Sequence, residues 1–109
     1  MLMATMKDRR GLTILHWAAQ CGYHDLALLL IKRGADTNYA DIDGQTPLHK
    51  VCKILGHKRG KTPLNCAARR GRKDVVKFLI AHGADTEKAD KSGNTPRALA
   101  RLWSDSDSD

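Results

Sequence analysis

The sequence repeats itself at fixed intervals, and this property restricts its fold more than any other. The pattern Gly-x-Thr occurs four times, beginning at positions 11, 44, 60 and 93, so the intervals are 33, 16 and 33 residues. The motif Gly-Ala-Asp-Thr occurs at 34–37 and 83–86, an interval of 49 residues, which equals one long and one short interval. Self-similarity at such a period predicts a solenoid of stacked units.

The residues around these motifs predict a turn, a helix, a second turn and a second helix in each complete unit. A threonine stands where a side-chain oxygen can cap a helix N-terminus, and in three units a proline follows at the first helical position. These residues are Thr13, Thr46, Thr62 and Thr95, with Pro47, Pro63 and Pro96. Leucine and valine at helical spacing predict the second helix, and Gly34 and Gly83 are placed to end it.

Taken together, the Gly turn, T-P-L-H-x-A-A, a further Gly, an apolar helix and G-A-D-x-N resemble the ankyrin repeat. The pattern is nearly complete in 8–40 and recurs in 57–89. The resemblance implies an all-α ankyrin-repeat solenoid, in which paired antiparallel helices are joined by β-turn or hairpin loops. We therefore expect an N-terminal extension over 1–7, a repeat domain over 8–103 and a disordered acidic Ser/Asp tail over 104–109.

Two units depart from this pattern. The second repeat, 41–56, holds a turn and a first helix but lacks its second helix, while 90–103 is a partial repeat whose Arg97 and Arg101 suit a polar cap. Solenoid stability is roughly a sum over repeats and their interfaces. We therefore predict low stability, with the first repeat poorly coupled to the third.

No cluster of residues indicates catalysis, a cofactor or a metal. The stretch 56–62 differs from a phosphate-binding loop, because only three residues separate its glycines. Cys52, His57 and Cys66 lack the close cysteine pairs of structural zinc sites. The resemblance implies that His16 and His49 link neighbouring turns by hydrogen bonds. We therefore predict a protein that is not an enzyme and has no cofactor.

Other features bear on the location of the chain. Cys21, Cys52 and Cys66 are interpreted as reduced thiols of a cytoplasmic or nuclear protein. No apolar run is long enough to span a membrane, so we expect no membrane partner. Ser104 and Ser106 each precede an aspartate by three residues, so we regard them as candidate phosphorylation sites for an acid-directed kinase.

The net charge of +7 favours acidic partners. Between Asp43 and Asp74 there are nine basic residues and no acidic one. The resemblance implies that partners bind on the turn tips and the exposed side of the first helices. The residues expected on this face are Arg9, Arg10, Trp17, Lys50, Lys53, Lys58, Arg59, Lys61, Arg69 and Arg70.

These observations predict a monomeric protein-interaction module of the adaptor, scaffold or regulatory-subunit type. It would bind an acidic partner segment through a basic concave face, with Trp17 as an anchor. Two alternatives stay open. The same face could bind nucleic acid or another polyanion, although no aromatic residues are interleaved with the basic ones near 50–73. Alternatively, the chain could be a truncated variant that has lost partner binding.

Overall fold

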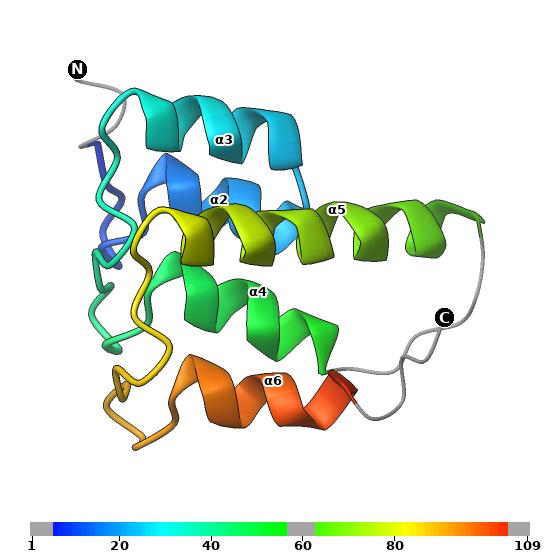
Figure 1. Cartoon of the computed structure of the whole chain (residues 1–109). Helices are drawn as coiled ribbons and strands as arrows, with labels where there is room; N and C mark the ends of the chain where they lie inside the picture. Colours follow the sequence, from blue (N-terminus) through cyan, green and yellow to red (C-terminus); the bar gives the residue numbers. More distant parts are fainter. Residues whose placement is uncertain (1–5, 57–62, 105–109) are drawn as a thin grey trace.

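The computed structural model describes the backbone of residues 6–56 and 63–104 and the side chains of residues 6–56 and 67–100. The helices of these segments are α2 (Ile14–Cys21), α3 (His24–Lys32), α4 (Pro47–Leu55), α5 (Pro63–Ala81) and α6 (Pro96–Ser104). They form two rows: α2, α4 and α6 pack in succession in one, and α3 and α5 pack side by side in the other (Figure 1). This arrangement is the all-α ankyrin solenoid predicted from the sequence.

The same turn precedes α2, α4 and α6. In each turn, one oxygen of an aspartate accepts hydrogen bonds of 2.9 Å from the backbone N–H groups two and four residues later; these aspartates are Asp8, Asp41 and Asp90. Neighbouring turns are joined through the backbone. The N–H of Ile42 donates to the carbonyl of Arg10, and the N–H of Lys91 donates to the carbonyl of Asp43, both at 2.9 Å. The three turns therefore form a continuous row.

Two buried histidines also connect this row. Nδ1 of His16 accepts a hydrogen bond of 3.0 Å from the N–H of Thr13, so the proton lies on Nε2, which donates to the carbonyl of Gln45 at 2.9 Å. His49 makes the same bonds with Thr46 and with the carbonyl of Asn94, both at 3.0 Å. The expectation that these histidines link neighbouring turns is confirmed. Thr13 and Thr46 also cap α2 and α4, as predicted.

The unit 57–89 corrects the sequence-based prediction. It was expected to form two helices separated by a turn near Gly71, but Pro63–Ala81 is a single helix of 19 residues. Gly22, at the matching position of the first repeat, has a φ of 77° and does form a turn. Gly71 instead continues the helix and packs directly against the backbone of Gly22. Only a residue without a side chain fits there, so Gly71 permits a close helix crossing.

The C-terminal half of α5 supplies the second helix that 41–56 lacks. α5 packs against α2, α3 and α4, and the loop after it pairs with the loop after α3. The side-chain amide of Asn38 donates to the carbonyl of Gly83 at 3.0 Å, and its oxygen accepts from the N–H of Asp85 at 2.7 Å. The expectation that the first repeat is poorly coupled to the third is therefore wrong.

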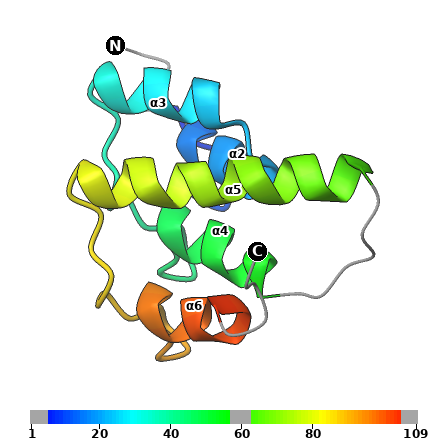
Figure 2. The same ribbon diagram turned by 45° about the vertical axis from the view of Figure 1, so that its right-hand side comes forward.

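In this arrangement, 57–72 interrupts one structural repeat between α4 and the rest of α5. Both views show the N-terminal end of α5 extending past the ends of α2, α3 and α4 (Figures 1 and 2). The crossing is fixed by the guanidinium of Arg72, whose Nε donates to the carbonyl of Gln20 at 2.9 Å. The hydrophobic core between the helices consists mainly of leucine, valine and alanine, including Leu15, Leu30, Leu48, Val51 and Ala19.

The structure describes residues at both edges of the expected repeat domain. Lys7, the last residue of the expected extension, forms a bridge with Thr13, and its Nζ donates to the hydroxyl of Tyr39 at 2.9 Å. At the other end α6 extends to Ser104, and Ser106 lies outside the described residues. None of the helices described is long and apolar enough to cross a bilayer.

Candidate interaction surfaces

The basic residues of the first turn lie at its tip. Arg9 and Arg10 are both exposed. Nη2 of Arg10 is 3.7 Å from a carboxylate oxygen of Asp43 in the next turn, and both side chains are more than half exposed. An ion pair this exposed adds little stability, so Arg10 remains available for a partner. Lys58, Arg59 and Lys61, expected on another turn, lie outside the described residues.

Lys50 and Lys53 lie three residues apart on α4, and their environments differ. Nζ of Lys50 is 3.1 Å from a carboxylate oxygen of Asp41, with side-chain exposures of 14% and 2%. Burial opposes ionisation of Asp41, but hydrogen bonds from the Gln45 N–H, from Lys50 and from the Asp43 N–H outweigh this effect and lower its pKa. Lys50 therefore has a structural role, whereas Lys53 is exposed.

Trp17 lies on α2 at the position that Lys50 occupies on α4, four residues after the capping threonine. Its side chain remains 47% exposed although α2 is otherwise well packed. Gln20 of α2 and Lys53 of α4 likewise occupy equivalent positions relative to their capping threonines. Because residues three apart share one face of a helix, these positions form one patch on the outer side of α2 and α4.

Arg69 and Arg70 lie on α5, away from the row of turns. They directly precede Gly71, and Gly71 packs on Gly22 just after the last residue of α2. The eight residues of α2 therefore separate them from the row of turns, a distance of roughly 12 Å. The prediction assumed that α5 turns at Gly71, and the continuous helix places these arginines at the opposite end of α2.

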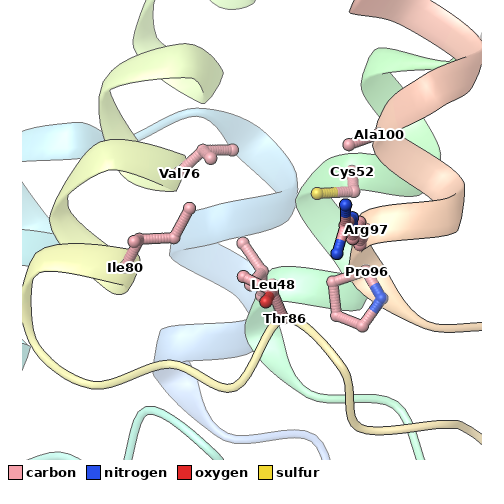
Figure 3. A pocket seen from close by; sticks show the side chains of 8 residues that line it. All are labelled: Leu48, Cys52, Val76, Ile80, Thr86, Pro96, Arg97 and Ala100. Carbon is pink, nitrogen blue, oxygen red and sulfur yellow. The ribbon is translucent and has the colours of Figure 1, made fainter.

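A groove that was not predicted from the sequence lies between α5 and α6. It has a volume of about 330 Å³. Leu48 and Cys52 of α4 lie between the two walls, Val76 and Ile80 on one wall and Pro96, Arg97 and Ala100 on the other, with Thr86 from the connecting loop (Figure 3). The signal was present in the sequence, because 90–103 contains a first helix without a second.

The cysteines and other candidate ligands form no convergent site in the described part of the chain. No group of three or more His, Cys, Asp or Glu side chains there could hold a metal ion. Cys21 and Cys52 are free thiols, and burial raises the pKa of Cys52 to about 12. The side chain of Cys66 lies outside the described residues.

Comparisons with known proteins agree with this architecture. The family described as ankyrin repeats (3 copies) matches residues 2–58 and 51–107. The E3 ubiquitin-protein ligase HACE1 of Xenopus tropicalis is 58% identical over 36 residues, which make up 33% of this chain and 4% of the ligase. The ankyrin repeat-containing protein P1E11.10 of Schizosaccharomyces pombe is 46% identical over 48 residues, which make up 44% of this chain and 23% of that protein.

The chain thus matches less than a quarter of the length of either relative. The family match, in contrast, extends over nearly the whole chain. It coincides with the stacked turns, the capping threonines and the linking histidines. Ankyrin repeats are in general modules for binding other proteins, and the chain belongs to the ankyrin-repeat family.

Proposed function

We propose that this chain binds an acidic segment of a partner protein on its turn–helix surface, defined as Arg9, Arg10, Trp17 and Lys53. The observation that carries the proposal is the exposure of Trp17, at 47%, on the outer side of the first-helix row. A large aromatic side chain in this position can bury much area on binding at low entropic cost. Tryptophan and arginine are also the residues that most often dominate binding energy.

The charges around Trp17 favour an acidic partner. Asp41 is occupied by Lys50 and by backbone N–H groups, so it presents little negative charge to a ligand. Arg9 and Lys53 are exposed cations on either side of Trp17, one in the turn before α2 and the other on α4. Complementary charge of this kind steers association and selects among partners.

The remaining basic residues extend the proposal. Lys58, Arg59 and Lys61 belong to the link between α4 and α5 and stay candidates for the same partner. Arg69 and Arg70, at the far end of α2, would reach only a partner that extends along the whole helix row. The row of turns is continuous despite the interruption of the second repeat, which favours a working surface over a truncated one. The free thiols of Cys21 and Cys52 support a cytoplasmic or nuclear setting.

Affinity capture with the full chain tests this proposal. The variants are Trp17→Ala and the double substitution Arg10→Glu, Lys53→Glu, and the control is Lys32→Glu, an exposed lysine on α3 in the other row. An acidic protein captured by the original chain and the control should bind about tenfold or more weakly to the variants.

Equal capture by all four chains would contradict the proposed surface. Competition distinguishes the polyanion alternative. Heparin and unrelated DNA that displace the partner from the chain at their own binding concentrations would indicate general polyanion binding, because such binding is indifferent to sequence.

A further inference from the structure

The outer face of α5 is exposed although the same face of α3 is covered. Measured back from the glycines that follow the two helices, Ala27 and Ile31 of α3 correspond to Val76 and Ile80 of α5. Ala27 and Ile31 are 0% and 7% exposed. Val76 is only partly buried, and Ile80 is 49% exposed. Two equivalent apolar positions are thus buried in one repeat and open in the next.

The cause of this difference is an unequal number of helices in the two rows. The face of α3 is covered by α5, which packs along it. In the described part of the chain α6 continues the first-helix row, but no helix continues the second row past α5 (Figure 1). The groove between α5 and α6 lies where the next second helix of the stack would pack.

The groove has the dimensions and the lining for an inserted apolar stripe. Its volume of about 330 Å³ lies at the lower end of the range for ligand pockets. Figure 3 shows Val76 and Ile80 on the α5 side facing the α6 side chains across this space, with Leu48 and Cys52 between them. The neighbouring α3–α5 contact shows which structure fills such a groove in this protein, namely an α-helix.

The charge of the rim selects among helices. Lys77 is exposed and lies on the same helical stripe as Val76 and Ile80, at the position where α3 carries Leu28. On the opposite wall Arg97 is largely exposed and lies 3.7 Å from Glu87. A helix that enters between these cations is favoured if acidic residues flank its apolar stripe.

A second copy of the domain does not fit this groove. Each complete repeat brings a first helix alongside its second helix, and α6 already occupies the first-helix position. The basic N-terminal half of α5 in another copy would also place Arg69 and Arg70 near Lys77 and Arg97. The occupant must therefore be a single helix that is not already paired within a repeat.

From these observations we propose that the groove between α5 and α6 binds one amphipathic helix of a partner protein, with aspartate or glutamate beside its apolar stripe. The helix lies next to α5 as α5 lies next to α3. This second docking surface is separate from the turn–helix surface, so the two could engage different parts of one partner.

A matched pair of peptides derived from α5 tests the proposal. α5 packs on α3, so a peptide of 72–82, which contains the C-terminal half of α5, has the shape required one position further along the stack. The acidic probe carries Arg72→Glu, Lys73→Glu and Lys77→Glu, and the basic probe keeps the natural residues. A hydrocarbon bridge on the outward face holds each peptide helical, because isolated helices this short are marginal in water.

Binding is measured by methyl NMR of the full chain, and the acidic probe should shift the methyl signals of Val76 and Ile80. Ile80→Glu should weaken its binding by about tenfold or more, because the apolar contact is lost. The matched control is Leu29→Glu on the solvent-exposed side of α3, where the leucine is 46% exposed; this variant should bind like the original chain. Lys77→Glu should weaken the acidic probe and strengthen the basic one.

Three outcomes would overturn the proposal: no methyl shifts with millimolar acidic probe, equal binding by the Ile80 variant, or equal affinity for both probes at low salt. The double substitution Arg10→Glu, Lys53→Glu should leave probe binding unchanged. If the double variant loses partner capture but still binds the probe, or shows the reverse pattern, the two surfaces can be judged independently. The failure of one proposal is then distinguishable from the failure of the other.

Discussion

Gly71 of α5 lies directly against the carbonyl group of Gly22, just past the end of α2. A Cβ on Gly71 would overlap the carbonyl oxygen of Gly22 and would lie 3.2 Å from its carbon. A Cβ on Gly22 would in turn lie 2.8 Å from the carbonyl oxygen of Ala68. The crossing of α5 over the α2–α3 connection therefore depends on two residues without side chains.

We expect Gly71→Ala to destabilise the domain, although alanine ordinarily favours a helix over glycine by about 1 kcal/mol. The methyl group must displace backbone atoms, and such overpacking typically costs about 1–3 kcal/mol. Urea unfolding followed by circular dichroism measures the difference. Ala67→Gly, at an exposed position of the same helix, reports helix propensity alone. An alanine at position 71 that raised the unfolding midpoint would show that α5 does not cross here.

The continuity of α5 can be tested by a distance. Spin labels at Ala67 and Ala81, both exposed, are placed in a chain whose cysteines have been replaced. In one helix the two Cα atoms lie about 21 Å apart, at 1.5 Å per residue. In the helix–turn–helix that the sequence alone suggests, the labels would come much closer together. A short interspin distance would contradict the continuous helix.

The sequence predicted those parts of the fold that local chemistry determines. Thr13, Thr46 and the histidines that follow them specify a capped helix and a link to the next turn, and both are present. The choice at Gly71 could not be read from the sequence, because glycine suits a left-handed turn and a close helix crossing equally well. That choice depends on the second repeat, 41–56, whose sequence stops after a first helix.

The candidate site was likewise predictable only where local sequence determines it. Exposure of Trp17 was predictable from its repeat position, but the burial of Lys50 was not, since it depends on Asp41 in the preceding turn. Arg69 and Arg70 were misplaced because their predicted location rested on a turn that does not form. Prediction of the groove at Ile80 required knowing which of the two helix rows ends first.

The link made by His16 should make stability depend on pH. Burial lowers the pKa of His16, although the hydrogen bond to Gln45 acts in the opposite direction. The folded state then binds fewer protons at this site than the unfolded state, so stability falls as the pH drops below the unfolded value of about 6.5. The free energy of unfolding, measured by urea between about pH 7 and pH 5, should fall less steeply in His16→Gln. The matched control is His82→Gln, a histidine substitution at an exposed position.

Cysteine reactivity provides an independent test of the core. Cys52 has a pKa of about 12 and is 2% exposed, so at pH 8 almost none of it is the reactive thiolate. Cys21 is only partly buried. Iodoacetamide should therefore modify Cys21 at least about a hundredfold faster than Cys52, as followed by peptide mass spectrometry. Comparable modification rates of Cys21 and Cys52 in native buffer would show that the reagent reaches Cys52, and therefore that the α4–α6 contact is open.

The interruption of the second repeat lies at the end of the helices opposite to the turns. The first part of α5, from Pro63 to Arg72, therefore extends the molecule sideways and leaves the spacing along the stack axis unchanged, since Asp41 and Asp90 still stand in adjacent turns. Insertions or deletions at this point change how far the domain protrudes, but they leave the spacing of its repeats along the solenoid unchanged. A lineage could therefore vary the part of this segment that precedes the Gly71 crossing, while the periodic surface beside it keeps its spacing.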